Sequence, residues 1–134
     1  GLTYGIGTSV SSGLLGDSYQ GRFSTDNARV AEAIELVRAE WEWLAGGGMT
    51  QEELDRTVTY LTGAYPLRFD GNGSIADIMA SMQFQGFPID YVNIRNDLIR
   101  AVTLDDVHRV SARLARPDDL FFVVVGQPQG LPAD

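Results

Sequence analysis

Cysteine and lysine are absent from the 134-residue sequence, and histidine occurs only once, as His108. Without cysteine there can be no disulfide, no thiolate zinc site and no cysteine nucleophile, although the redox compartment stays open. A single imidazole also leaves almost no material for a catalytic zinc site with two or three histidines or for a Ser-His-Asp triad. The composition therefore excludes most self-contained hydrolases.

Positive charge is scarce as well. Eighteen acidic residues face ten basic residues, all of them arginine, which gives a formal net charge of −8. This balance argues against a surface that binds nucleic-acid phosphates or an anionic membrane. No apolar run reaches the roughly 18 residues that a membrane-spanning helix requires.

The chain is long enough for one domain with one core, since folding at this size buries about two-thirds of the extended chain's surface. Its first residues alternate in the period-2 pattern of a half-buried strand, with Leu2, Tyr4, Ile6 and Thr8 on one face. A start inside a strand is an unusual domain boundary. We therefore expect residues 1–134 to be a fragment, the later part, of one domain.

The remaining pattern predicts a hairpin, then helices, then a closing strand. A second strand is expected over residues 18–25, joined to the first through residues 13–17. Helical periodicity begins near residues 27, 50, 74, 88 and 103, and three of these starts follow a capping-box pattern: Thr50 with Glu53, Ser74 with Asp77, and Thr103 with Asp106.

The apolar run at residues 120–125 predicts a central strand covered on both faces. The fold class is therefore α+β, with helices packed on a mostly antiparallel sheet. Three strands are few for so many helices, so we expect the sheet to continue into strands that precede Gly1.

Two candidate metal sites have stronger structural explanations. Residues 70–74 offer alternating oxygen ligands like the start of a calcium loop, but Ile75 stands at the glycine position and Ser81 where a bidentate Glu is needed. Capping of the next helix is the favoured interpretation. His108 has no second imidazole with which to bind a metal, so a packing or surface role is favoured.

Tyr4, judged by composition and spacing alone, is a strand tyrosine that packs its ring and hydrogen-bonds its hydroxyl.

Several segments in order resemble the second domain of the pitrilysin (insulinase-like) zinc metallopeptidases. They are the Gly-Leu-Thr-Tyr-Gly start, the Ser-rich hairpin, the acidic helix from Asn27, the Thr-Gln-Glu-Glu-Leu helix start at Thr50 and the strand from Phe121 to Gly126. The resemblance covers essentially the whole chain. It implies a metallopeptidase-like α+β domain of a bacterial processing-peptidase-like subunit.

In this family an H-x-x-E-H helix supplies two zinc ligands and the base that activates water, and that motif is absent from this chain. An Arg and a Tyr from the strand with the G-L-T-Y pattern act on the carbonyl under attack. The resemblance assigns this role to Tyr4, as a donor in the oxyanion hole. The matching Arg is expected about seven residues earlier, before Gly1.

The resemblance further implies that zinc belongs to the parent enzyme or a partner subunit, and that this chain holds no cofactor. Its implied partners are a peptide substrate, the N-terminal part of the same protein and a second subunit in a homo- or heterodimer, without nucleic acid or membrane. Many bacterial relatives are exported, which implies the periplasm.

Two alternatives stay open. One is a non-catalytic scaffold or partner subunit of a peptidase complex. The other is an unrelated α+β binding module, which would be favoured if the first two strands did not share a sheet with residues 120–125.

Overall fold

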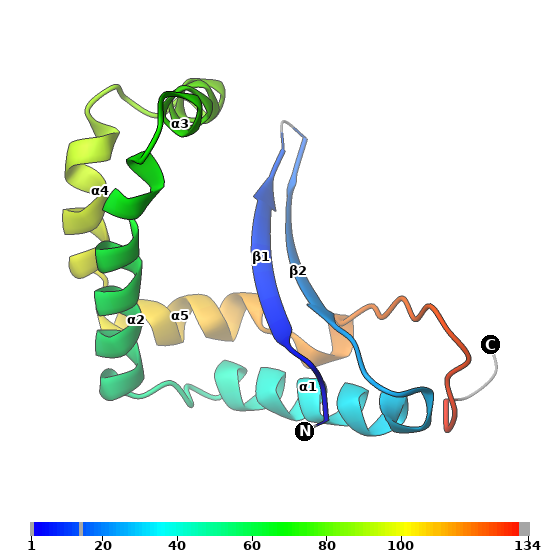
Figure 1. Ribbon diagram of the computed structural model, residues 1–134. Helices are drawn as coiled ribbons and strands as arrows, with labels where there is room; N and C mark the ends of the chain where they lie inside the picture. Colours follow the sequence, from blue (N-terminus) through cyan, green and yellow to red (C-terminus); the bar gives the residue numbers. More distant parts are fainter. Residues whose placement is uncertain (1, 14, 132–134) are drawn as a thin grey trace. The chain divides into compact units, whose positions relative to one another are not determined.

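A computed structural model describes residues 2–13 and 15–131, and within them the chain is α+β as predicted (Figure 1). The elements, in chain order, are β1 Ile6–Ser12, β2 Asp17–Phe23, η1 Asn27–Arg29, α1 Val30–Ala45, α2 Gln51–Ala64, η2 Pro66–Phe69, α3 Asn72–Phe84, α4 Tyr91–Arg100, α5 Leu104–Leu114 and η3 Pro117–Asp119, where η marks a 3-10 helix. They divide into two compact units, Gly1–Trp43 with Ala115–Asp134 and Leu44–Leu114.

The strands of the first unit form an antiparallel hairpin, as the alternating pattern predicts. Ile6 pairs with Phe23 at the open end, and Ser12 pairs with Asp17 beside the turn. The hairpin contacts α1 through Tyr19, whose ring stacks on Trp41 with centroids 5.3 Å apart. Aromatic pairs in this geometry stabilise beyond the area they bury, so the stack helps to fix the hairpin on the helix.

The apolar stripe of α1 supplies most of the small core of this unit. Val30, Ala33 and Ile34 are buried, and their spacing of three to four residues places them on one face of the helix. Arg38, on the same helix, donates a hydrogen bond from Nη1 to the Pro117 carbonyl at 3.0 Å, and its guanidinium lies 5.1 Å from the Phe122 ring centroid. Arg38 thereby ties residues 117–122 to α1.

The expected central strand at residues 120–125 is not present. No strand in the described part of the chain pairs with this segment, and the only described sheet is the two-stranded hairpin. Phe121, Val123 and Val125 are 89%, 77% and 95% exposed. A strand needs a neighbouring strand to accept its backbone hydrogen bonds, and the described residues supply none for this segment.

In the second unit, two of the three predicted capping boxes form. The Thr50 hydroxyl accepts a hydrogen bond from the Glu53 main-chain N–H, while the Glu53 carboxylate accepts from the Thr50 N–H at 2.9 Å. Thr103 and Asp106 make the same reciprocal pair at the start of α5. Each box satisfies main-chain donors that a helix N-terminus otherwise leaves unpaired.

The third predicted box, Ser74 with Asp77, does not form. Helix α3 begins at Asn72, and the Ile75 N–H donates to the Gly71 carbonyl at 3.0 Å, so Ser74 already lies inside the first turn. Its hydroxyl therefore cannot occupy the capping position, and no side chain caps this helix. Residues 70–74 form a turn and the start of α3, so the expectation that they cap this helix with a side chain is wrong.

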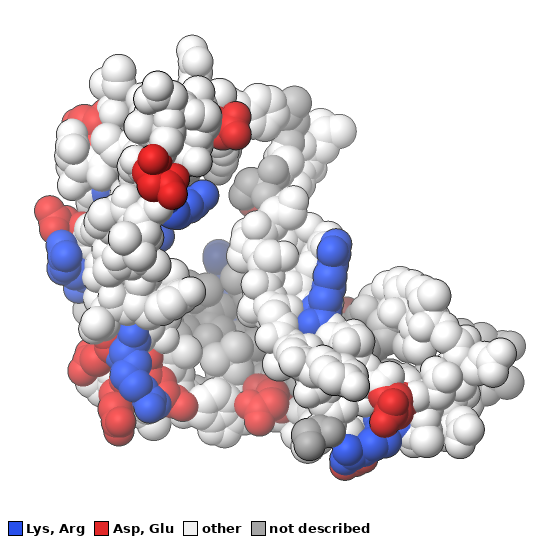
Figure 2. Space-filling view, in the orientation of Figure 1, with Lys and Arg blue, Asp and Glu red and all other residues white. Residues whose placement is uncertain are grey.

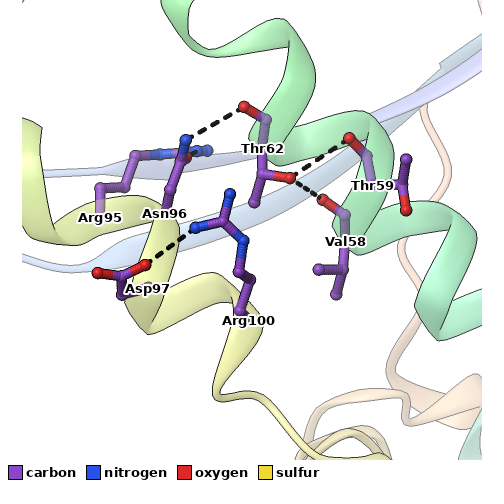
Figure 3. A network of polar contacts seen from close by, with 7 residues as sticks. All are labelled: Val58, Thr59, Thr62, Arg95, Asn96, Asp97 and Arg100. Atoms are coloured by element: carbon purple, nitrogen blue, oxygen red, sulfur yellow. Dashed lines mark hydrogen bonds and ion pairs between the residues drawn. The ribbon is translucent and has the colours of Figure 1, made fainter.

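Helix α4 is fixed against the last turn of α2 by two polar side chains, Asn96, whose bond to Thr62 is drawn in Figure 3, and Arg95. Asn96 Nδ2 donates to the Thr62 carbonyl at 3.1 Å, and Arg95 Nη1 donates to the Leu61 carbonyl at 3.2 Å. Both carbonyls belong to the last four residues of α2, which have no partner within their own helix. A neighbouring helix thus supplies the C-terminal cap of α2.

Candidate functional site

Tyr4, the one residue expected to act in catalysis, lies in a bend just before β1 rather than within the strand. Its side chain is 101% exposed, and its hydroxyl has no hydrogen-bond partner among the described residues. The expectation that its ring packs and its hydroxyl is bonded is therefore wrong. The alternation that suggested a strand from Leu2 extends beyond the backbone pairing, which starts at Ile6 opposite Phe23.

The backbone just before Tyr4 is held by a hydrogen bond from the segment that follows β2. The Thr25 hydroxyl, just past β2, donates to the Leu2 carbonyl at 2.6 Å. Leu2, Thr3 and Ile6 line an apolar hollow of about 220 Å³ whose far wall includes Trp41 of α1. Tyr4 is not part of that lining, so its neighbours are anchored while its phenol stays open to solvent.

His108 has a packing role, as favoured from the sequence. Its Nε2 lies 2.9 Å from the Met49 carbonyl oxygen, which fixes Nε2 as the donor. Gly47, at φ +79°, passes beneath the imidazole, and a Cβ placed there would meet the ring at 3.7 Å. His108 therefore joins α5 to the loop between α1 and α2.

Zinc is the cofactor that the family resemblance implies, and the donor set does not fit it. In the described part of the chain, no three His, Asp or Glu side chains are close enough together to hold a metal ion. Across the same part, no helix is both long and apolar enough to cross a membrane.

The charged side chains are dispersed over the surface rather than gathered in one patch of a single sign. On the face shown in Figure 2, acidic side chains alternate with arginines and with uncharged surface. Five exposed ion pairs join side chains three or four residues apart on their own segments: Arg29–Glu32, Arg56–Glu52, Arg100–Asp97, Arg109–Asp106 and Arg116–Asp119. Such local pairs contribute little to stability, and they do not form a binding site.

Hydrogen bonds at the starts of α2 and α5 lower the pKa of two carboxyl groups. Bonds from Thr103 and Arg109 lower the pKa of Asp106 to about 2. The Thr50 main-chain and side-chain bonds likewise lower the pKa of Glu53. Both shifts favour the charged carboxylate and belong to capping, because neither group faces a cavity.

Sequence reasoning missed one polar cluster. Arg68 and Arg95 line a hollow of about 340 Å³ in the second unit, together with aromatic side chains. They are 27 positions apart and belong to different elements, so no local spacing could reveal them.

The described residues thus define an α+β protein with an exposed tyrosine before its first strand and no metal-binding cluster. Residues 1–61 match the family model described as the Peptidase M16 inactive domain. The match confirms the resemblance to the pitrilysin-like peptidase family, and it spans the hairpin, α1 and most of α2. Comparison with curated proteins found no match.

The family match bears on the alternative of an unrelated binding module. The absence of pairing between the hairpin and residues 120–125 is the observation expected for that alternative. The match over residues 1–61 includes the Gly-Leu-Thr-Tyr start but extends far beyond it. The family resemblance therefore does not depend on a chance occurrence of that short motif. The match supports the peptidase-family resemblance over residues 1–61.

Proposed function

We propose that this chain is the later part of the second domain of a zinc-dependent endopeptidase, and that it contributes Tyr4 to the attacked peptide carbonyl but not the metal. The observation that carries the proposal is the full exposure of the unpartnered Tyr4 phenol, beside residues anchored by Thr25. A phenol that is already bonded within its own domain could not serve a substrate.

The chemistry required of Tyr4 is hydrogen-bond donation. As water attacks a peptide carbonyl, negative charge grows on the carbonyl oxygen. A hydrogen bond donated to that oxygen is therefore stronger in the transition state than in the ground state. Removing one such donor typically raises the barrier by about 2.7 to 4 kcal/mol. The zinc ion and the base that activates water would come from another domain or subunit.

The rest of the domain is proposed to supply strands that pair with residues 120–125. This segment exposes Phe121 and Val123, and its β-branched composition suits a buried sheet. Strands that precede Gly1 would accept its free backbone groups and bring Tyr4 and this segment into one sheet. The arginine that would act with Tyr4 is proposed to lie in the same preceding segment.

The alternative is a non-catalytic scaffold or partner subunit of a peptidase complex. The description of the matching family model as an inactive domain favours it. In either case the partners would be the N-terminal part of the same protein and a second subunit, and the ligand would be a peptide.

The test is Tyr4→Phe in the full-length protein, assayed on unfolded peptides with its zinc-bearing domain or subunit present. The proposal predicts a kcat lower by about 10²- to 10³-fold with KM little changed, because only transition-state stabilisation is lost. Tyr60→Phe, which alters a phenol 72% exposed on α2, is the matched control and should leave turnover unchanged. Equal turnover of Tyr4→Phe and the unaltered protein would exclude the catalytic role, and no turnover in any pairing would favour the scaffold.

A further inference from the structure

The second unit contains a semi-enclosed hollow of about 340 Å³ that is bordered by η2, α3 and α4 and by Tyr65 at the end of α2. Its lining combines two cations, one anion and three aromatic rings: Arg68, Arg95, Asp77, Tyr65, Phe87 and Tyr91. Tyr4 is not among these residues. The hollow is about the size that holds a single amino-acid residue or a small ligand.

The two arginines differ from most others in this acidic chain. Arg29, Arg56, Arg100, Arg109 and Arg116 each pair with a carboxylate. Across the described residues, neither Arg68 nor Arg95 makes an ion pair, even though Asp77 lines the same hollow. Two arginines without an ion pair among the described residues therefore line one small hollow.

Arg95 is held in place while part of its guanidinium stays available. Its Nη1 donates to the Leu61 carbonyl at 3.2 Å and to Asn96 Oδ1 at 3.0 Å, and the group lies 4.2 Å from the centroid of the buried Tyr65 ring. Its Nε and Nη2 have no partner among the described residues. A guanidinium fixed by stacking and by one nitrogen is pre-organised to bind an anion with the others.

The aromatic side chains supply an apolar wall beside this cation. The rings of Phe87 and Tyr91 stack with centroids 4.3 Å apart, and Phe87 remains 41% exposed. A ligand side chain could cover the open face of this pair, which would bury apolar surface.

We propose that the hollow binds the free α-carboxylate of an aromatic residue, with the carboxylate on Arg68 and Arg95 and the ring against Phe87 and Tyr91. A carboxylate matches the planar fork of a guanidinium, and the adjacent rings favour an aromatic over a polar side chain. The source is either the C-terminal residue of a peptide or a free amino acid. Asp77 lines the same hollow, and as a like charge it weakens the binding of a carboxylate without preventing it.

The direct test is an NMR titration of the 134-residue chain with N-acetyl-L-phenylalanine, followed through the amide signals of α3 and α4. Saturable shifts are expected, whereas N-acetyl-L-phenylalaninamide, which lacks the carboxylate, should cause none. The tripeptide Ala-Ala-Phe and free L-phenylalanine then distinguish a peptide end from an amino acid, and binding of either supports the site. Equal binding of the acid and the amide would overturn the proposal.

Charge variants at the exposed positions of the hollow give a second readout. Arg68→Ala should weaken binding of N-acetyl-L-phenylalanine about three- to tenfold through loss of one charge-assisted contact. Arg113→Ala removes an exposed arginine of α5 that does not line the hollow and should change nothing. Asp77→Asn should tighten binding, because it removes a like charge.

Arg68 and Asp77 are both exposed, so neither change should unfold the chain, and circular dichroism checks this. Unaltered affinity in Arg68→Ala, or weaker binding in Asp77→Asn, would contradict the assignment. The experiments require no peptide hydrolysis, so their failure would leave the proposed role of Tyr4 untouched.

Discussion

The side-chain amide of Asn96 donates a hydrogen bond to the main-chain carbonyl of Thr62, 34 residues earlier, at 3.1 Å. Thr62 lies in the last turn of α2, where carbonyl groups lack partners within the helix, and its hydroxyl bonds back to the Val58 carbonyl (Figure 3). Together with Arg95 on Leu61, this bond fixes α4 to the end of α2.

Asn96→Ala is expected to destabilise the protein by about 1 kcal/mol, because it leaves the part-buried Thr62 carbonyl without its donor. Urea unfolding followed by circular dichroism measures the difference. Asn93→Ala on the same helix is the control, since Asn93 is exposed and its side chain has no partner among the described residues. Equal midpoints for the two variants would show that the Asn96 bond does not stabilise the helix pair.

Thr50→Ala is expected to lower the free energy of unfolding by about 1 kcal/mol through loss of the N-cap of α2. Thr57→Ala, within the same helix, is the comparison. The Thr57 hydroxyl only bonds back to the Glu53 carbonyl, and alanine has the higher helix propensity, so this change should be neutral or slightly stabilising. The cap would be unimportant if both variants unfolded at the same denaturant concentration.

Acid should weaken the start of α5. The pKa of Asp106 is lowered from 3.8 to about 2, chiefly by the Thr103 hydroxyl and then by Arg109. A lowered pKa means that the folded state favours the carboxylate, so the stabilisation is fully present above about pH 4 and is lost as the pH falls through about 2. The carboxyl carbon shift of Asp106 should titrate near pH 2 by NMR.

The corresponding variant, Asp106→Asn, should be less stable than the unaltered protein at about pH 6, and the gap should narrow toward about pH 2. The control is Asp105→Asn, at the neighbouring position of the same first turn. A gap that stays constant with pH would argue against the Thr103–Asp106 pair as its source.

Tyr19→Leu should destabilise the hairpin of the first unit by about 1 kcal/mol, because leucine keeps an apolar side chain but loses the stack on Trp41. Amide hydrogen exchange of β1 and β2 should accelerate. Tyr19→Phe retains the ring and should exchange like the unaltered protein, since no hydrogen bond from the Tyr19 hydroxyl is present among the described contacts. Identical exchange in the leucine and phenylalanine variants would exclude a role for the stack.

Local rules predicted local structure well. The Thr-x-x-Glu and Thr-x-x-Asp patterns at Thr50 and Thr103 each form a reciprocal cap, because both partners lie within one turn of the same helix. The same rule was wrong at Ser74, because the N-cap position is occupied by Gly71, three residues before the expected position. A capping pattern fixes which residues can bond but not the residue at which the helix begins.

Features that depend on distant segments were less predictable. The strand expected at residues 120–125 has the right composition and no partner among the described strands, and Tyr4 precedes the paired part of β1 although it shares the alternation. Arg68, Arg95 and Phe87 line one hollow only because η2, α3 and α4 pack around it.

The sequence by itself determined the α+β class, the hairpin and the caps of α2 and α5, because each rests on periodicity or on residues within a few positions of one another. It also carried the resemblance to the peptidase family, through motifs spread along the chain, and the family model matches residues 1–61. The lack of cysteine and the single histidine also exclude, on composition alone, thiolate sites and sites built from several imidazoles. Only the tertiary structure decided that the Tyr4 phenol is open to solvent and that two arginines without an ion pair among the described residues line one hollow. The exposure of a side chain and the meeting of distant residues at one hollow both depend on how helices and strands pack. Packing brings together residues that no sequence spacing relates.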